Sequence, residues 1–365
     1  MASIDNFEFA HRHHKDVAWM SQNTNTLPLH PKIEAAIKKS VDEREFNLYP
    51  FKRGVFGLSE GIKADLGLED FDVHMTNGGI EGTYIATRAL LKPGDEVVST
   101  DPSFLPIHEQ VSMSAARPVE VDIYRKPWVL TPEAAEEAVT PATKMLLLID
   151  PNNPLGSGYA RSQVKGLGEV AEDHGLWLID DITYRDFNPE HVLSTEFYPE
   201  KTLVSYSFSK GPGLAGMRIG AILAPPAVMK ELRRFDTNVL GVNVLAQRAA
   251  LAALETKKEW LPGVRKTCAA NQEMIRTAVE KVDGASLPVY PSKANMFCID
   301  LSVTGVNPEK VEEVLLKEHF VHTRAGSYLS KRSGGEFLRV SFTVSEMDCR
   351  RFADALPKVI ETLRR

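Results

Sequence analysis

The sequence alternates short, almost entirely apolar runs with longer amphipathic ones, and this alternation limits the folds open to the chain. Five short runs predict strands: EVVSTD (96–101), KMLLLID (144–150), LWLID (176–180), TLVSYSFS (202–209) and RIGAILAP (218–225). A strand without polar alternation is typical of a parallel sheet that is covered by helices on both faces. The runs at 80–91 and 161–175 carry apolar residues at the spacing of such helices. The pattern predicts an α/β fold with a large, mostly parallel sheet flanked by helices.

The last third of the chain has a different pattern, which indicates a smaller second unit. A long helical run at about 242–282 precedes strands predicted at 295–301 and 337–343 and helices predicted near 308–318 and 345–364. This order of elements is typical of an α+β domain. We therefore expect three parts, an N-terminal segment (1–44), a large domain (45–245) and a small C-terminal domain (246–365).

Composition and charge narrow the classes of partner. The formal net charge of −6 over 365 residues argues against nucleic acid or an anionic membrane as the partner. No apolar run reaches the roughly 18 residues of a membrane span, and the N-terminus lacks the apolar core of a signal peptide. The three widely spaced cysteines indicate neither a disulfide framework nor a zinc cluster, and HRHHK (11–15) is interpreted as a solvated segment. We expect a cytoplasmic protein without a metal site.

Polar, glycine-rich loops follow the predicted strands. They read TNGGIEG (76–82), DPSF (101–104), DPNNPLG (150–156), DDITY (180–184) and SFSKG (207–211). In an open parallel sheet, ligands bind beyond the carboxyl ends of the strands. We therefore expect these loops to form one site.

Two of these loops carry groups suited to a heterocyclic ligand. A buried carboxylate, from Asp180 or Asp181, could hold a proton on a ring nitrogen, and Tyr184 could donate its phenol proton nearby. The amide of Asn153, held in a Pro/Gly turn, could bind a ligand oxygen. Each motif also has a purely structural reading, since an Asp pair often caps a helix.

Two further loops are suited to an anion. Gly78 and Gly79 precede a predicted helix, where bare backbone N–H groups bind anions. Ser207 and Ser209 can each donate a hydrogen bond to a phosphate, and the Arg218 guanidinium can donate two parallel hydrogen bonds to it.

Lys210 lies in the middle of the phosphate-binding residues. A lysine whose pKa is lowered by its surroundings forms a Schiff base with a carbonyl compound. A ligand with an aldehyde, a pyridine nitrogen, a phenolic oxygen and a phosphate would suit all of these groups. Pyridoxal 5′-phosphate (PLP) has this structure.

In these motifs the chain resembles fold-type I PLP enzymes of the class I/II aminotransferase family, from about residue 20 to the C-terminus. SFSK matches S-x-x-K, with Arg218 at the family's spacing of eight from Lys210, and NNPLG is similar to N-P-x-G. DITY matches D-x-x-Y, which selects Asp181 as the partner of the ring nitrogen. The chain length and NTNTLPLHP (23–31) resemble the shorter, histidinol-phosphate aminotransferase-like branch.

The resemblance also implies roles for residues outside these motifs. Backbone groups of Gly79 and Ile80 would bind the cofactor phosphate, and Phe104 would stack on the ring. Arg339 in FLRVSFT would hold the substrate α-carboxylate, together with Asn153. The remaining residue with an implied role is Tyr49, in NLYP, which would reach the cofactor phosphate of a partner subunit. The expected assembly is therefore a homodimer with shared active sites.

The resemblance implies an aminotransferase that moves an amino group from an L-amino acid to a 2-oxo acid, with Lys210 as acid and base. A PLP-dependent lyase or decarboxylase could use the same site. A serine acyl enzyme would share S-x-x-K but needs S-D-N or K-T-G, which the sequence lacks. A PLP-binding regulator is disfavoured because Lys210, Asp181 and Arg339 are all present. Arg53 and Arg324 are either substrate-binding cations or ordinary surface residues.

Overall fold

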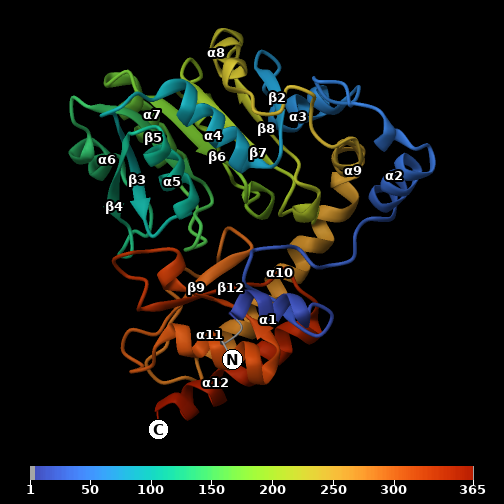
Figure 1. The fold of residues 1–365 in the computed structure, drawn as a ribbon. Coiled ribbons are helices and arrows are strands. Elements are labelled where there is room, and N and C mark those ends of the chain that lie inside the picture. Colours follow the sequence, from blue (N-terminus) through green and yellow to red (C-terminus); the bar gives the residue numbers. More distant parts are fainter. Residues whose placement is uncertain (1–4, 365) are drawn as a thin grey trace.

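The computed structural model, which describes residues 5–364, contains one large sheet and a smaller unit below it (Figure 1). The large sheet has the strand order β2-β8-β7-β6-β5-β3-β4. Its strands are β2 (Asp72–Thr76), β3 (Glu96–Asp101), β4 (Arg117–Asp122), β5 (Thr143–Ile149), β6 (Trp177–Asp181), β7 (Thr202–Ser207) and β8 (Gly220–Ala224). Strand β8 pairs antiparallel with β2 and β7, and the other neighbours pair parallel. The predicted α/β class is confirmed.

Helices cover both faces of this sheet, as its apolar strands require. They are α2 (Pro31–Asp42), α3 (Leu58–Leu66), α4 (Gly79–Leu90), α5 (Leu105–Met113), α6 (Pro132–Ala138), α7 (Arg161–Asp173), α8 (Pro226–Leu232) and α9 (Val244–Glu255). Along β5, Met145 and Leu147 pack in a core with α4, α5 and α8, whereas Leu146 and Leu148 pack in a core with α6 and α7. Both faces of the strand are therefore buried, which explains its continuous apolar run.

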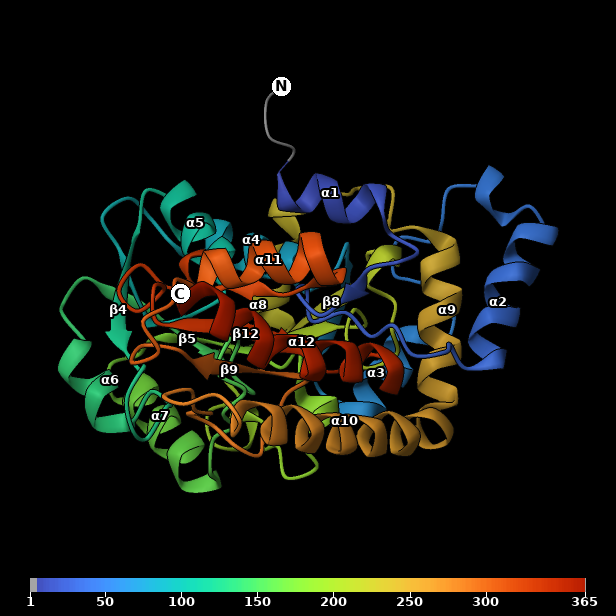
Figure 2. The same ribbon diagram turned by 90° about the horizontal axis from the view of Figure 1, so that it is seen from below.

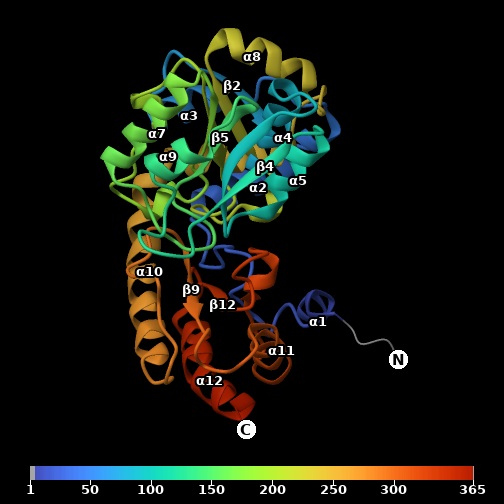
Figure 3. The same ribbon diagram turned by 90° about the vertical axis from the view of Figure 1, so that its left-hand side faces the viewer.

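The smaller unit combines the C-terminal part of the chain with its N-terminal strand. Its elements are α1 (Asn6–Arg12), β1 (Ala18–Trp19), α10 (Lys257–Val279), β9 (Met296–Asp300), α11 (Pro308–His319), β10 (Val321–His322), β11 (Arg324–Ala325), β12 (Phe337–Ser341) and α12 (Glu346–Arg364). Strands β11, β12 and β9 form an antiparallel sheet, and β1 pairs parallel with β10. Figure 3 shows α1 next to α11, on the far side of this unit from α10. The two ends of the chain thus share one unit.

Short 3-10 helices complete the fold. They are η1 (Glu45–Asn47), η2 (Arg185–Phe187), η3 (Ser194–Glu196), η4 (Ala215–Met217), η5 (Arg233–Phe235) and η6 (Gly326–Tyr328). The strand predicted from residue 218 begins only at Gly220, because Arg218 closes η4 in a left-handed conformation with φ 54°. This turn places the Arg218 side chain beside the loop that precedes α4, where its guanidinium donates to the Asn77 carbonyl at 3.0 Å.

The long helical run predicted at 242–282 is divided into two helices. Thr256 ends α9, and its hydroxyl donates to the Ala252 carbonyl at 2.7 Å. From there α10 runs in another direction (Figure 2). Helix α9 packs with α2 and α3 against the large sheet, while α10 packs with α12 in the small unit. The domain division near residue 245 stays a prediction.

Candidate active site

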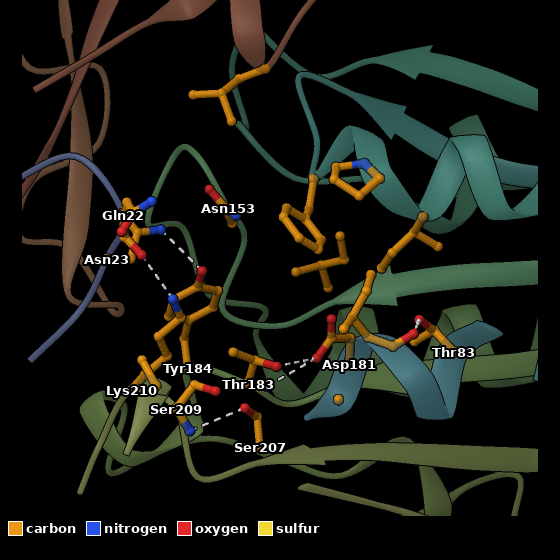
Figure 4. A pocket seen from close by; sticks show the side chains of 18 of the residues that line it. Gln22, Asn23, Thr83, Asn153, Asp181, Thr183, Tyr184, Ser207, Ser209 and Lys210 are labelled. Carbon is orange, nitrogen blue, oxygen red and sulfur yellow. Dashed lines mark hydrogen bonds between the residues drawn. The ribbon is translucent and has the colours of Figure 1, made fainter. Parts of the chain in front are cut away.

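A cavity of about 450 Å³ lies where the carboxyl ends of the parallel strands face the small unit. Its lining includes every residue with a role in the expected cofactor and substrate site except Tyr49, namely Gly79, Ile80, Phe104, Asn153, Asp181, Tyr184, Ser207, Ser209, Lys210, Arg218 and Arg339, whereas the candidates Gly78 and Asp180 do not line it. Figure 4 shows side chains from both units converging on this space. The loops after β2, β3, β5, β6 and β7 all contribute, as expected for an open α/β sheet.

Lys210 lies three residues beyond β7, on the cavity wall (Figure 4). Its Nζ donates a 2.8 Å hydrogen bond to the backbone carbonyl of Gln22. Desolvation lowers the pKa of Lys210 to about 7, with further lowering by the positive charges of Arg339 and Arg218 and an opposing effect from Asp181. A substantial fraction of this lysine is therefore a neutral amine near pH 7, as a nucleophile or general base requires.

The two adjacent carboxylates of β6 point to opposite faces of the sheet, as neighbouring strand residues do. Asp181 lines the cavity and accepts hydrogen bonds from the Thr183 hydroxyl at 2.6 Å and the Thr183 backbone N–H at 3.1 Å. Asp180 accepts a 2.9 Å bond from the Ser194 backbone N–H. Burial raises the pKa of Asp181 and raises that of Asp180 to about 6. Of the pair, only Asp181 can reach a ligand in the cavity.

Tyr184 forms the wall next to Lys210. Its ring centre lies 6.0 Å from Lys210 Nζ, and its phenol oxygen accepts a 3.0 Å hydrogen bond from the Asn23 amide. Burial raises the pKa of Tyr184 to about 12. The phenol therefore stays protonated at neutral pH and can donate to a ligand.

Arg339, on strand β12 of the small unit, provides a buried guanidinium on the cavity wall. It donates to Asn153 Oδ1 at 2.8 Å and to the Ser21 carbonyl, while its Nε has no partner among residues 5–364. Burial lowers the pKa of Arg339 to about 10, so the group is still a cation at neutral pH. A buried cation with an unused N–H is suited to a ligand carboxylate.

The start of α4 and the turn after β7 form the anion-binding end. The helix begins at Gly79, so its first N–H groups have no partners within the helix. A methyl group on Gly78, where φ is 85°, would lie 2.4 Å from Arg218 Nη2, and one on Gly79 would lie 2.9 Å from Ser205 Oγ. The sequence therefore needs glycine here to let Arg218 approach the helix N-terminus.

Sequence reasoning missed the segment that crosses the cavity. Ser21, Gln22 and Asn23 line it and contact Arg339, Lys210 and Tyr184, respectively. The only local signal was a polar triplet directly after the apolar run VAWM.

The two arginines left open by the sequence differ in position. Arg324 lines the cavity, with its guanidinium carbon 4.5 Å from the centre of the Tyr328 ring. Arg53 is exposed and lies outside the cavity. Tyr49 also lies outside it, with 80% of its surface exposed.

Residues 5–364 offer neither a membrane-spanning helix nor a metal-binding cluster. No helix there is long and apolar enough to cross a membrane. The same residues contain no group of three or more His, Cys, Asp or Glu side chains arranged to hold a metal ion.

Known proteins resemble the chain over most of its length. The model of the family described as aminotransferase class I and II matches residues 15–356. An aspartate aminotransferase of Pyrococcus horikoshii is 28% identical over 342 residues, covering 90% of this chain and 87% of that protein. Histidinol-phosphate aminotransferase 2 of Carboxydothermus hydrogenoformans is 30% identical over 287 residues, covering 77% and 76%. The solved N-succinyldiaminopimelate aminotransferase from Mycobacterium tuberculosis shares the fold, with a TM-score of 0.86, 21% identity and coverage of 98% and 100%.

Proposed function

The chain belongs to the class I and II aminotransferases, and from this premise we propose that its cavity moves an amino group from a dicarboxylic or phosphorylated amino donor to a 2-oxo acid. The protein is a transaminase, and its cofactor is PLP. A lyase or decarboxylase outcome is not favoured, because the related proteins are aminotransferases.

The cavity has the chemical groups that PLP requires. At one end, the first N–H groups of α4, the hydroxyls of Ser207 and Ser209 and the Arg218 guanidinium suit the phosphate. Elsewhere on the cavity wall, the desolvated Asp181 carboxylate forms no ion pair among the described residues and suits a protonated ring nitrogen. Phe104 adds an apolar face to the same cavity. The donor set therefore fits this cofactor.

Lys210 carries the proposal, because it is a desolvated amine with a pKa of about 7 in the middle of these groups. When bound, PLP supplies an aldehyde for amino groups and a ring that withdraws electrons from the α-carbon of the substrate. Lys210 Nζ takes the α-proton of the amino acid as a base and later returns it as an acid. Asp181 keeps the ring nitrogen protonated, and Tyr184 donates toward the phenolic oxygen.

The substrate carboxylate would bind Arg339, supported by Asn153. The second acidic group is inferred from Arg324, a further guanidinium on the same cavity, which interacts with the Glu312 carboxylate through space without forming an ion pair among the described residues. Aspartate, named in one related protein, carries a second carboxylate, whereas histidinol phosphate, named in another, carries a phosphate and no carboxylate. We therefore favour a dicarboxylic or phosphorylated amino donor.

A homodimer with shared sites is part of the proposal. Residues near Tyr49 form an unusually exposed apolar stretch, with exposed fractions of 74% at Leu48, 56% at Phe51 and 87% at Phe56. Large apolar side chains exposed together mark protein interfaces. A second copy covering this stretch would bring Tyr49 to the partner's cofactor. A cytoplasmic location stays a prediction and is consistent with the three free, buried cysteines.

The decisive experiment combines PLP binding with a panel of amino donors. Borohydride reduction of the holoenzyme should fix the cofactor on Lys210, as peptide mass spectrometry would show, and Lys210→Ala should bind PLP without being labelled. With 2-oxoglutarate as acceptor, aspartate or a phosphorylated amino alcohol should give product faster than alanine. Labelling of another lysine, or normal turnover by Lys210→Ala, would refute the assignment.

A further inference from the structure

The segment at residues 20–25 runs between the two units (Figure 1), residues 21–23 line the cavity, and strand β12 holds the segment in register. The Ser341 backbone N–H donates to the Met20 carbonyl at 2.8 Å, and Arg339, two residues earlier on the same face of β12, donates to the Ser21 carbonyl. This pairing places Asn23 opposite Ser341 and against Tyr184. The segment is thus fixed from the small unit while its side chains reach the large one.

Asn23 uses all of its polar groups in this position. It is 1% exposed, its backbone N–H donates to Ser341 Oγ at 2.9 Å, and its carbonyl accepts from Asn295 Nδ2 at 2.9 Å. Its Oδ1 accepts from Ser341 Oγ at 2.8 Å, and its Nδ2 donates to the Tyr184 phenol oxygen at 3.0 Å. Its backbone φ of 54° is left-handed, a conformation that Asn tolerates better than most residues. Three features of the position therefore favour asparagine: an acceptor at Oδ1, a donor at Nδ2 and a left-handed backbone.

The hydrogen-bond pattern fixes the direction in which each proton points. Ser341 Oγ already accepts from the Asn23 backbone N–H, so its own hydrogen is free to be donated and requires an acceptor. That acceptor is Asn23 Oδ1, which leaves Nδ2, a group that can only donate, facing Tyr184. Tyr184 Oη is consequently an acceptor in this bond, and its O–H must point elsewhere. The open direction is the cavity that Tyr184 lines (Figure 4).

We propose that Asn23, oriented by Ser341, is a positioning residue that keeps the Tyr184 hydroxyl pointing into the cavity as a donor to the phenolic oxygen of PLP. This inference rests on the proposed function, because only a bound cofactor gives that proton a partner. A donor at this oxygen favours its negatively charged form, and an amide bond to Tyr184 makes the phenol a stronger donor. The charged groups facing Tyr184 are Lys210, Arg339 and Asp181.

The test is a pH titration of the visible absorbance of the bound cofactor, which needs no turnover. Asn23→Gly keeps the left-handed backbone but deletes the amide, and should raise the titration midpoint by about one pH unit, the equivalent of one ordinary hydrogen bond. Asn23→Asp should raise it further, because a carboxylate accepts the phenol proton and adds negative charge. Ser341→Ala should shift it in the same direction by less. Thr24→Ala, next to Asn23 but without a side-chain hydrogen bond among those described, is the matched control and should leave it unchanged.

A double-mutant cycle separates this role from a general loss of structure. In a Tyr184→Phe background, Asn23→Gly should cause no additional shift, because there is no phenol left to orient. An equal shift with and without the phenol would overturn the proposal, as would an unchanged midpoint in Asn23→Gly. Borohydride labelling of Lys210 in every variant reports on the proposed function separately. If labelling fails in the wild type, the function is wrong; if labelling persists without the shift, only the role of Asn23 is wrong.

Discussion

Arg324 and Arg339 are direct partners on the antiparallel strands β11 and β12, and both line the same cavity. Like charges placed directly opposite each other on a sheet repel, so the pair is destabilising until anions bind. The Arg324 guanidinium lies over the Tyr328 ring in a cation–π contact, while Arg339 is desolvated, with its pKa lowered to about 10 by burial. The arrangement favours a substrate with two negative groups.

Replacing Arg324 should therefore change specificity more than catalysis. Arg324→Gln should lower kcat/KM for a dicarboxylic donor. The loss should correspond to about 1.5–3 kcal/mol of transition-state binding, the usual contribution of a hydrogen bond to a charged group. The kcat/KM for norvaline, an amino acid of similar length with an uncharged side chain, should be almost unaffected. Steady-state kinetics with both donors measure this, with the exposed Arg332→Gln as control. An equal loss for both donors would assign Arg324 to the structure of the site instead.

Arg339 should be needed for every amino donor that carries an α-carboxylate. Arg339→Lys should lower kcat/KM by an amount that corresponds to on the order of 2–5 kcal/mol of transition-state binding. The reason is that an ammonium group cannot form the two parallel hydrogen bonds that a guanidinium forms with a carboxylate. The measurement is the same donor panel, extended to amines that lack a carboxylate. Those amines should lose little, and a uniform loss across acids and amines would contradict the assignment.

The rate at which Lys210 forms an imine with an aldehyde should depend on pH, with a midpoint near neutrality. The amine reacts only when unprotonated, so the rate should rise with pH to a midpoint near 7, well below the roughly 10.4 of an exposed lysine. Asp181→Asn should lower the midpoint, since Asp181 opposes the lowering, and Arg218→Gln should raise it. Stopped-flow absorbance with pyridoxal, which has no phosphate, follows this in the apo-protein. A midpoint above pH 9 would show that Lys210 is solvated.

Gly78→Ala should damage the cofactor site beyond its effect on folding. The added methyl group would meet Arg218 Nη2 at 2.4 Å, so Arg218 must move away from the start of α4. Gly94→Ala is the matched control, because Gly94 has a similar φ of 89° with open space around its Cβ position. Both variants should lose about 1–2 kcal/mol of stability to backbone strain. Only Gly78→Ala should weaken PLP binding, as fluorescence titration would show, and equal affinities would remove the steric argument.

The shared-site model predicts complementation between two inactive variants. Tyr49→Ala and Lys210→Ala should each lose most of their activity, and mixing them under conditions of subunit exchange should restore part of it. A hybrid dimer can place both defects in one site and leave the other intact. Activity and analytical ultracentrifugation are measured together. A monomeric active species, or hybrids that form without regaining activity, would place Tyr49 outside the active site.

The sheet and the strand-end loops could be predicted because both are encoded locally. Apolar runs such as 144–150 define buried strands, and the polar residues after them follow from the topology of an open sheet. The choice between Asp180 and Asp181 could not be made this way, since a strand buried on both faces shows no polar alternation. Resemblance selected Asp181, and the structure places it on the cavity side.

Features that depend on contacts between residues far apart in the sequence could not be predicted from local sequence patterns. The break at Thr256 separates two good helical sequences that pack on different units. Arg53 and Arg324 looked equivalent in the sequence, and only tertiary structure brings Arg324 into the cavity. Asn23 is 318 residues from Ser341, which orients it, so its position has no local signature.

That separation has a consequence for the biosynthesis of the protein. The strands of the large sheet all lie before residue 225 and can assemble while the ribosome is still translating the rest. Strand β1 and the crossing segment are made before the large sheet, but their partners β10 and β12 are made after it. The nascent chain therefore carries this segment unpaired while the large sheet is synthesised. The cavity gains its last wall only when β12 meets residues made more than 300 positions earlier.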